Sequence, residues 1–556
     1  MALDSPQRSF SGGLLVIAVV AFCVVLPFVK FGIPSGHDFE FHFNSWIEVV
    51  EHWKQGVLYP HWAAMAHYGY GEARFILYPP TSWTLGAILG VILPWKLVAG
   101  AYIWIALTLS GCSMFLLARR WLPRVDAVFA AAVYAANPYH LVIVYWRSAF
   151  AELLAAAYLP LLFLLVLRSD EEGPRAVAPL SLLMAAGWLT NLPAAVMMNY
   201  SLAVLLICVA ISRRSFMVLA YGALAAIVGA ALAGFYLLPA FHQQSWVNIG
   251  QVLEPGLRPQ ESFLFTTTTD LDHNRFNLLV SVVAAWQIAI LAAALFISRR
   301  RNQTWWLLIF VWSVLCVLLM LRFTLPLWMH LPELRFVQFP WRWLLCLNVP
   351  FALAIILSLR RWWLRGLVYC VSVGGVLLVW HSVQPPWWDK AADLQEMVDN
   401  QRDGIGNDGA DEYVPAGTDP YEVDQKAPLA EFEGKGEAQI QIERWNAESR
   451  LLNAKTSAPG RLVLRVFNYP SWKVLVNDRS VETKTTTPTG QMVIPVAAGE
   501  NRIQIRFVEG WDRMTGIGIS VCALALLLVW FFVSRRSLRL QLRVRAESRK
   551  LRTGFP

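Results

Sequence analysis

The chain has 556 residues, of which 56% are hydrophobic and only 15% are charged. Soluble globular proteins average about 25% charged residues, so this composition excludes that class, together with a disordered chain, a collagen-like fibre and a small disulfide-rich scaffold. The formal net charge is +9, yet residues 383–511 hold 14 basic and 20 acidic residues, so the positive excess lies elsewhere. The sequence therefore predicts a basic body in a membrane and an acidic, water-exposed segment. Arg in short loops gives no indication of nucleic-acid binding.

Long apolar runs recur along the chain, each close to the ~20 residues that cross a bilayer as a helix. We expect about twelve transmembrane helices, at residues 11–29, 97–118, 125–143, 150–167, 176–192, 194–212, 216–238, 277–297, 304–322, 341–358, 364–382 and 513–533. Clusters of Arg occupy every second short loop, which places those loops and both termini in the cytoplasm and the protein in a bacterial inner membrane. The first run is expected to be an uncleaved span, because it lacks a small-residue cleavage pattern.

The first outer segment, residues 30–96, belongs to the transmembrane domain that we expect over residues 1–382. Phe39, Phe43 and Trp46 recur in this segment at helical spacing, which predicts a helix with an apolar stripe. We expect the helix to lie in the membrane interface, with its Trp at the depth of the lipid headgroups.

Asp38 opens that helix, and His42 follows one turn later on the same face. The pattern supports two interpretations of Asp38 equally: it caps the helix, or it acts in catalysis. Asp38 and His42 are also suitable ligand types for a divalent cation such as Mg²⁺ or Mn²⁺. Their spacing matches no closed zinc pattern, and the sequence does not require a metal.

Ionisable residues also gather at the outer ends of later spans. Arg147 and Glu152 lie where the third span meets the fourth, His242 follows the seventh, and Arg342 precedes the tenth. Because ionisable side chains at a membrane edge are costly, they indicate functional sites. Arg147 and Glu152 predict either a structural ion pair or part of a site, and Arg is the expected residue for holding a lipid phosphate.

A second domain is predicted outside the membrane over residues 383–511. Its first part is polar, and residues 437–507 alternate between apolar and polar positions, which predicts a small antiparallel β domain, a sandwich. The domain has no catalytic triad or metal motif, so it is expected to bind a ligand or to shape the outer part of the protein rather than to catalyse a reaction. Residues 512–556 are expected to form the last transmembrane helix and a basic cytoplasmic tail. All seven Cys fall within predicted spans, which implies no disulfide framework.

Several motifs resemble those of a known group. The runs GHDFEFH (36–42), FILYPP (75–80), YWRSAFAELL (145–154) and QFPWRWL (338–344) look like bacterial membrane proteins with the domain labelled 6-pyruvoyl-tetrahydropterin synthase-related. The run FNYPSWKVLVND (467–478) also resembles YfhO-like membrane proteins. The pterin synthase of the label is a soluble enzyme, and nothing in this sequence resembles its fold or zinc site. By architecture the group is similar to GT-C glycosyltransferases, which have many spans, an acidic residue in the first outer loop and an outer domain.

The resemblance implies a GT-C-like fold and a catalytic acid at Asp38, accompanied by His42 and Glu152. The expected catalytic residues are Asp38 and Glu152; the expected substrate-binding residues are His37, Glu40, His42, His67, Arg74, Tyr78, Arg147, His242 and Arg342; and the tentative metal ligands are Asp38 and His42.

The preferred hypothesis is a membrane glycosyltransferase that acts on the extracytoplasmic face. Nucleotide sugars are cytoplasmic, so the expected donor is a polyprenyl-phosphate sugar, and the acceptor is a glycan, lipid or protein of the cell envelope. Asp38 is expected to act as general base, and Arg147 or Arg342 to hold the phosphate of the leaving group. The alternative is a non-catalytic protein that binds or transports lipid-linked saccharides, with the β domain as its binding module.

Overall fold

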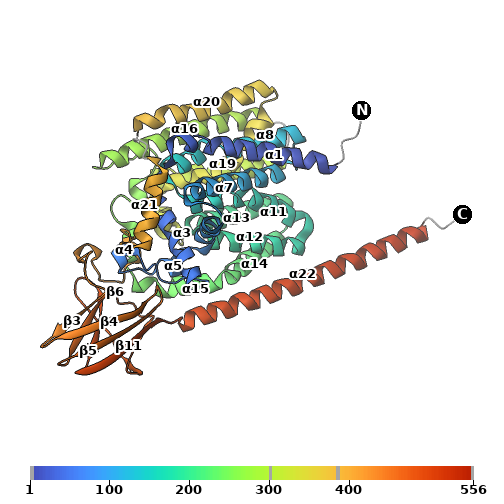
Figure 1. Ribbon diagram of the computed structural model, residues 1–556. Helices are drawn as coiled ribbons and strands as arrows, with labels where there is room; N and C mark the ends of the chain where they lie inside the picture. The colour runs from blue at the N-terminus through green and yellow to red at the C-terminus, as the bar shows by residue number, and fades with distance from the viewer. Residues whose placement is uncertain (1–5, 300–302, 384–387, 553–556) are drawn as a thin grey trace.

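A computed structural model describes residues 6–299, 303–383 and 388–552, most of them in helices (Figure 1). The helices are α1 (Pro6–Val25), α2 (Phe28–Phe31), α3 (Phe39–Lys54), α4 (Ala66–Gly69), α5 (Arg74–Leu77), α6 (Pro80–Ile92), α7 (Trp95–Ala118), α8 (Arg124–Ala135), α9 (Pro138–Val142), α10 (Phe150–Ala155), α11 (Tyr158–Glu172), α12 (Val177–Thr190), α13 (Leu192–Arg213), α14 (Met217–Leu232), α15 (Gly234–Gln243), α16 (Leu271–Ser298), α17 (Gln303–Leu319), α18 (Leu325–His330), α19 (Leu344–Ser358), α20 (Trp362–Val383), α21 (Ala391–Arg402) and α22 (Trp511–Arg552).

The described residues contain eight helical stretches that are long and apolar enough to cross a membrane, or up to ten if each of two bent pairs counts as one span. The predicted number of twelve is larger for two reasons. The 41-residue stretch Phe150–Thr190 counts once by length and composition, although α11 and α12, which correspond to the predicted spans 150–167 and 176–192, pack against each other across Gly173 (φ +58°). The described apolar part of α20, Trp362–Leu377, is shorter than a full span. A mostly helical body with eight to ten candidate spans is therefore what the described chain supports.

The two ends of the chain lie on the same side of the molecule. In Figure 1, α1 starts and α22 ends at the right, whereas the strands of the C-terminal β region lie at the left. α22 has 42 residues, so at about 1.5 Å per residue it is roughly 63 Å long. It starts beside the β region and packs along α15 and α14. This arrangement fits an outer β region with both termini on the opposite side of a bilayer.

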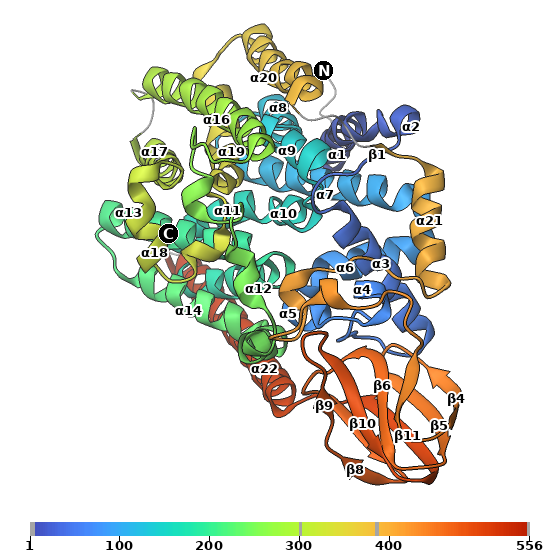
Figure 2. The same cartoon turned by 90° about the vertical axis from the view of Figure 1, so that its left-hand side faces the viewer.

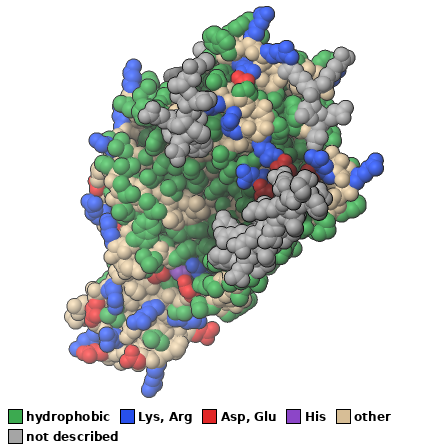
Figure 3. Space-filling view, turned by 90° about the vertical axis from the view of Figure 1, so that its right-hand side faces the viewer, with side chains coloured by type: hydrophobic (Ala, Val, Ile, Leu, Met, Phe, Trp, Pro, Cys, Tyr) green, Lys and Arg blue, Asp and Glu red, His purple; other side chains and the backbone are tan. Residues whose placement is uncertain are grey.

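The surface of the helical body is mainly hydrophobic. Figure 3 shows this surface with Lys and Arg at its edges, whereas the β region at the lower left has charged side chains of both signs. Large apolar side chains are exposed on several candidate spans, among them Leu15, Phe22, Ile227, Phe296 and Leu526. A soluble protein rarely exposes so much contiguous apolar surface, so the lipid of a membrane is its natural cover.

The helix predicted near Asp38 exists as α3, and its apolar stripe is covered by protein: Phe39, Phe43 and Trp46 have no exposed surface. The Trp46 ring stacks on Tyr102 of α7 at 5.1 Å and on Phe150 of α10 at 5.4 Å. Trp46 therefore packs in the protein core and not among lipid headgroups, because the pattern that marks an apolar face does not say whether lipid or protein covers it. The depth of α3 in a membrane stays a prediction.

The C-terminal β region contains two antiparallel sheets. Their strands are β3 (Ala430–Gly434), β4 (Ala438–Trp445), β5 (Ser449–Thr456), β6 (Gly460–Phe467), β7 (Trp472–Val476), β8 (Arg479–Val481), β9 (Lys484–Thr485), β10 (Gln491–Val496) and β11 (Gly499–Phe507). One sheet has the order β3-β6-β10-β9, and the other has the order β4-β5-β11-β7-β8. Apolar side chains of both sheets share one buried cluster. A separate two-stranded sheet pairs β1 (Ile33–Pro34) with β2 (Trp388–Asp389) beside α2, away from the strands of the β region (Figure 2).

The β region rests on the first outer segment, below α3 and α5 in Figure 2. The backbone N–H of Ala447, in the β4–β5 turn, donates to Gln55 Oε1 just after α3, at 3.0 Å. Trp62 has no exposed surface and packs its ring on Trp472 of β7. α3 therefore links the centre of the helical body directly to the β region.

His61 adds a charged contact to this docking. Its Nδ1 lies 3.2 Å from Glu448 Oε1, and its Nε2 lies 3.1 Å from Glu509 Oε1. Burial lowers the pKa of His61, but hydrogen bonds to the carboxylates of Glu448 and Glu509 outweigh it and raise the pKa to about 9. The His61 side chain is therefore a protonated imidazolium in the folded protein at neutral pH.

Replacing His61 by Gln should weaken the docking in a pH-dependent way. Because the pKa is about 9 in the folded protein against an ordinary 6.5, the stabilisation is complete below about pH 6.5 and is lost as the pH rises through about 9. The thermal midpoint of the wild type should exceed that of His61→Gln most at pH 6.5 and by little at pH 10. A difference that stays constant from pH 6.5 to 10 would contradict the assignment.

Candidate active site

Asp38 lies in a turn whose backbone is tied to a distant part of the chain. The N–H of Asp38 donates to the carbonyl of Arg147 at 2.9 Å, and the N–H of Gly36 donates to Ser148 Oγ at 3.0 Å. A Cβ on Gly36 would come within 2.4 Å of the carbonyl oxygen of Trp146, so this close approach requires glycine. The turn thereby fixes Asp38 beside the third predicted span.

The side chain of Asp38 makes no capping hydrogen bond, although the residue occupies the N-cap position of α3. The capping interpretation of this residue was therefore wrong. Capping needs the side-chain oxygen to reach an N–H in the first turn of the helix.

The partner of this turn is an irregular helix end. After α9 the chain forms a π-helical turn, η1 (Ile143–Arg147), and Ser148 then takes a left-handed conformation with φ +50°. The Ser148 hydroxyl donates to the carbonyl of Pro34, which holds the irregular turn against β1. Such π turns are frequent at functional sites, because the extra residue re-aims a side chain. Here the turn ends at Arg147, which points into the protein.

A buried charge cluster centres on Glu152. Arg147 Nη1 donates to Glu152 Oε2 at 2.6 Å, and the Tyr139 hydroxyl donates to Glu152 Oε1 at 2.7 Å. Arg342 Nε lies 3.2 Å from Glu152 Oε2. All four side chains are buried: even Arg342 is only 8% exposed. Two guanidinium groups thus share the one carboxylate of Glu152.

Arg342 comes from the turn η8 (Pro340–Trp343), almost two hundred residues after Glu152. Its Nη1 donates to the carbonyl of Val337 at 2.7 Å and to Gln338 Oε1 at 3.0 Å. Its Nε makes the ion pair with Glu152 but has no hydrogen-bond acceptor among the described residues. A buried guanidinium N–H without an acceptor suits an anionic ligand such as phosphate.

Three further predicted residues surround Asp38. Burial lowers the pKa of His42 to about 4, although the carboxylate of Asp38 raises it, so the imidazole is neutral near pH 7. Burial also lowers the pKa of His37. The carboxylate of Asp38 raises that pKa, and the positive charge of Arg147 lowers it. Burial and then the carboxylate of Asp38 raise the pKa of Tyr78 well above its ordinary value.

Tyr78 lies beside His42, with ring centres 5.9 Å apart. Its pKa is also lowered by Arg342 and raised by Glu152, so it lies within electrostatic range of both. The structure thereby brings together seven of the predicted site residues: Asp38, His37, His42, Tyr78, Arg147, Glu152 and Arg342.

Two other predicted residues form a second buried network. His67 Nε2 lies 2.9 Å from Glu72 Oε2, and Arg74 Nε donates to Glu72 Oε1 at 2.5 Å. The Arg74 guanidinium also covers the ring of Phe41 and donates to Ser45 Oγ on α3. These contacts hold the chain after α4 against α3, and within the described residues no ion pair joins this network to Glu152.

Glu40 and His242 lie elsewhere. Glu40 is exposed, and partial burial of its side chain raises its pKa, as do the carboxylates of Asp389 and Asp408. The His242 ring packs between Trp246 and Trp511, at the start of α22. The structure therefore does not bring these two predicted substrate-binding residues to Asp38.

Sequence reasoning missed three contributors: Tyr139, which binds Glu152; Ser148, which holds the irregular turn; and Gly36, which permits the close approach. The sequence did contain a signal for Tyr139, because its hydroxyl group lies at the outer end of the third predicted span, about two helical turns before Arg147. Nothing in the sequence indicates the π turn.

The predicted divalent-cation site has two candidate ligands, Asp38 and His42. Within the described ranges, no group of three or more His, Cys, Asp or Glu side chains is placed to hold a metal ion. The two guanidinium groups of Arg147 and Arg342 already supply positive charge beside Asp38. The cation on Asp38 and His42 stays a prediction, and no step below depends on it.

The fold and this cluster define a polytopic membrane protein with a charged site at the ends of several spans. The model of the 6-pyruvoyl-tetrahydropterin synthase related domain, described as a membrane protein, matches residues 75–384. The chain belongs to this family, as its motifs predicted. No curated protein matches the chain.

Among solved structures, the chain is similar to the Archaeoglobus fulgidus oligosaccharyltransferase. The crystal structure of the apo form matches with 14% identity over 74% of this chain and 57% of that chain, at a TM-score of 0.34. The A. fulgidus enzyme AglB, in complex with an inhibitory peptide and a dolichol-phosphate, matches with 13% identity over 71% of this chain and 56% of that chain, at a TM-score of 0.38. The chain thus spans little more than half the length of these proteins.

Proposed function

We propose that this protein is a membrane glycosyltransferase of the GT-C type. It moves a sugar from a polyprenyl-phosphate donor to a glycan, lipid or protein acceptor on the extracytoplasmic face of the bacterial inner membrane. The observation that carries the proposal is the hydrogen bond from the Asp38 N–H to the carbonyl of Arg147, which brings the Asp38 turn to a buried pair of guanidinium groups that share the carboxylate of Glu152. A base and cationic groups that hold a phosphate are what such a transfer needs.

The chemistry assigns one role to each part of the cluster. The acceptor O–H gives its proton to the Asp38 carboxylate while its oxygen forms a bond to the anomeric carbon of the sugar. The bond from that carbon to the phosphate oxygen breaks, and the electron pair leaves with polyprenyl phosphate. Arg147 and Arg342 hold the charge that grows on this phosphate, a stabilisation that is strongest in a buried site.

A lipid-linked donor suits the surroundings of the site. Arg147, Glu152 and Arg342 lie at or beside the ends of candidate spans, where a lipid phosphate would reside. On the proposed topology this site faces outward, because the Arg clusters and both termini occupy the opposite side, and nucleotide sugars are absent there.

The test uses membranes from cells that produce this protein and from matched cells that lack its gene. Radiolabelled polyprenyl-phosphate hexoses are supplied as donors, and the label that passes from the lipid to an envelope acceptor is measured. We expect gene-dependent transfer from at least one lipid-linked hexose and none from nucleotide sugars supplied to the outer face. If no lipid-linked hexose gives gene-dependent product while the same hexose lipid binds the purified protein, the binding or transport alternative holds instead.

A further inference from the structure

Gln338 lies in a strained turn of the backbone, four residues before Arg342. Its φ is +64° and its ψ is −62°, and the N–H of Phe339 donates to the carbonyl of Val337 at 2.8 Å across the turn. This geometry is a γ-turn of the rare kind whose central residue has positive φ. The conformation is strained for a residue other than glycine, and strain of this kind concentrates at functional sites. A glutamine at this position therefore points to a function for its side chain.

The Gln338 side chain accepts one hydrogen bond and donates another. Its Oε1 accepts from Arg342 Nη1 at 3.0 Å, and its Nε2 donates to the carbonyl of Val252 at 2.7 Å. The same Nη1 of Arg342 donates to the carbonyl of Val337 at 2.7 Å, so the turn presents two acceptors to one guanidinium nitrogen. Because the guanidinium group is planar and rigid, these contacts and the ion pair of Nε with Glu152 together fix its orientation.

The acceptor of the Gln338 amide belongs to an anchored loop. Val252 lies in the turn η4 (Ile249–Leu253), directly after Asn248. The Asn248 side chain donates to the carbonyl of Thr418 at 3.1 Å and accepts from the N–H of Gly417 at 3.1 Å, both in the segment before the β strands. The carbonyl of Val252 is therefore held in place, and Gln338 cannot turn away from Arg342 without losing its bond to this loop.

The turn also places the aromatic rings on which the two guanidinium groups lie. Phe339 and Trp341 stack with their ring centres 4.8 Å apart and their planes 6° from parallel. The guanidinium of Arg342 lies 4.7 Å from the ring centre of Phe339. The guanidinium of Arg147 lies 4.8 Å from the ring centre of Trp341. Each cation thus has its own ring, a favourable contact that holds the two groups in distinct positions around Glu152.

One nitrogen of Arg342 is available to a ligand. Nε pairs with Glu152 and Nη1 donates to the turn, whereas Nη2 makes no hydrogen bond within the part of the chain that the structure describes. Arg342 also lies within electrostatic range of the Asp38 carboxylate. Guanidinium N–H groups bind phosphate oxygens directionally, so the orientation of Arg342 decides whether Nη2 reaches such an oxygen.

We propose that Gln338 positions Arg342, so that its guanidinium group faces the phosphate of a polyprenyl-phosphate lipid. The identity of this lipid rests on the proposed function, whereas the orientation of Arg342 by Gln338 does not. Gln338 contacts no reacting atom and is a positioning residue. Loss of its side chain should therefore weaken binding of the phosphate and leave binding of the prenyl chain unchanged.

The experiment compares two ligands that differ only in the phosphate. Full-length protein purified in detergent is titrated with farnesyl phosphate and with farnesol, and calorimetry gives both dissociation constants. We expect the wild type to bind farnesyl phosphate more tightly than farnesol. Gln338→Met keeps the length of the side chain but removes both hydrogen bonds. It should bind farnesyl phosphate about tenfold more weakly, the effect of one lost hydrogen bond to a charged group, and bind farnesol as the wild type does.

Gln338→Gly separates the side chain from the turn. Glycine adopts positive φ without strain, so this variant keeps the turn and loses only the two side-chain hydrogen bonds. It should lose the same affinity for farnesyl phosphate as Gln338→Met, and it carries the test if Gln338→Met does not fold.

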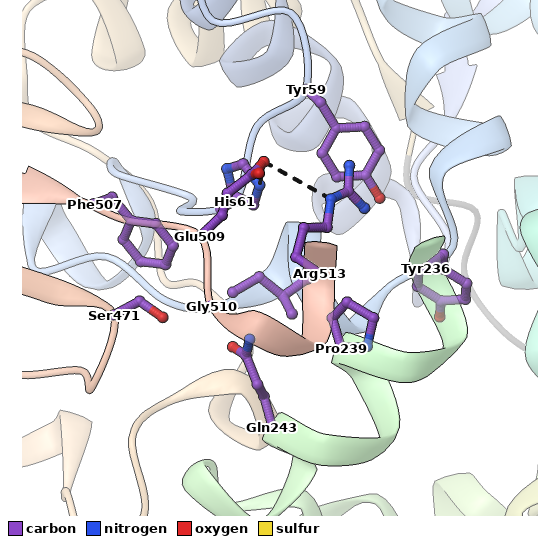
Figure 4. A pocket seen from close by; sticks show the side chains of 11 residues that line it. Tyr59, His61, Tyr236, Pro239, Gln243, Ser471, Phe507, Glu509, Gly510 and Arg513 are labelled. Carbon is purple, nitrogen blue, oxygen red and sulfur yellow. Dashed lines mark ion pairs between the residues drawn. The ribbon is translucent and has the colours of Figure 1, made fainter. Parts of the chain in front are cut away.

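Gln243→Met is the matched control. Gln243 lies where α15 meets the start of α22, as Figure 4 shows. Its Nε2 donates to Asp512 Oδ2 at 2.6 Å, and its Oε1 accepts from the Tyr469 hydroxyl at 2.9 Å. Among the described residues, neither bond involves the Glu152 cluster. This variant loses the same number of hydrogen bonds as Gln338→Met, yet its preference for farnesyl phosphate over farnesol should equal that of the wild type.

Three results would overturn the proposal: the wild type does not prefer farnesyl phosphate, the folded Gln338 variants bind farnesyl phosphate as Gln243→Met does, or they lose affinity for both ligands equally. The last result would give Gln338 a merely structural role. Failure of the proposed function is distinguishable from all three. If the preference depends on Gln338 while no lipid-linked donor is ever consumed, Gln338 positions Arg342 in a protein that binds lipid phosphates without transferring sugar.

Discussion

Asp38→Asn should lower the rate of sugar transfer by about 10²–10⁴-fold, the usual contribution of a general base. The amide has nearly the same shape as the carboxylate but cannot accept the proton of the acceptor hydroxyl. The backbone contacts that hold the turn, from Asp38 N–H to the carbonyl of Arg147, do not involve the side chain and are retained. The variant should therefore fold normally and fail in catalysis.

The measurement is the initial rate of label transfer in membranes with matched protein levels. Glu51→Gln is the control, because Glu51 lies on the same helix, is exposed and pairs only with Lys54 among the described residues. Its rate should stay within about twofold of the wild type, because exposed pairs contribute little. Full activity of Asp38→Asn at normal expression would remove Asp38 from the role of base.

Glu152→Gln should destabilise the protein by about 3–5 kcal/mol, the typical cost of removing one partner from a buried ion pair. The amide keeps the hydrogen bond from Tyr139, but Arg147 and Arg342 then face each other without their shared carboxylate. The loss should be visible as a marked fall in the thermal midpoint of the purified protein, together with loss of transfer.

Glu171→Gln is the comparison for this variant. Glu171 also pairs with an arginine, Arg120, but at the surface, where both side chains are substantially exposed. Removing it should cost at most about 1 kcal/mol. Equal midpoints for the two variants would mean that the Glu152 carboxylate does not compensate the buried guanidinium groups.

The broad architecture was predictable because hydropathy and alternation are local signals. Apolar runs gave the helical body, and period-two alternation gave the C-terminal β region, since both patterns arise within one element. The number of spans was less predictable, because an apolar run does not show whether its helix bends, as α14 and α15 do by 73°. The sandwich arrangement of the two sheets stays a prediction.

The candidate site was predictable as a set of residues but not as an arrangement. Asp38, Arg147, Glu152 and Arg342 stood out because charge near a membrane edge is costly. Their convergence depends on which spans are neighbours, and the sequence holds no record of that. The same limit applies to Arg74 and His67, whose shared partner Glu72 the sequence does not indicate; their part in substrate binding stays a prediction.

The order of the charged residues along the chain also has a consequence for biosynthesis. Arg147 and Glu152 are neighbours in sequence, so they can enter the membrane together as a neutral pair, which avoids about 2.5–3.5 kcal/mol for each isolated charge. Arg342 is synthesised much later and joins a carboxylate that is already paired. The second guanidinium group therefore reaches Glu152 only after the tenth predicted span has been synthesised, so the complete cluster forms late in biosynthesis.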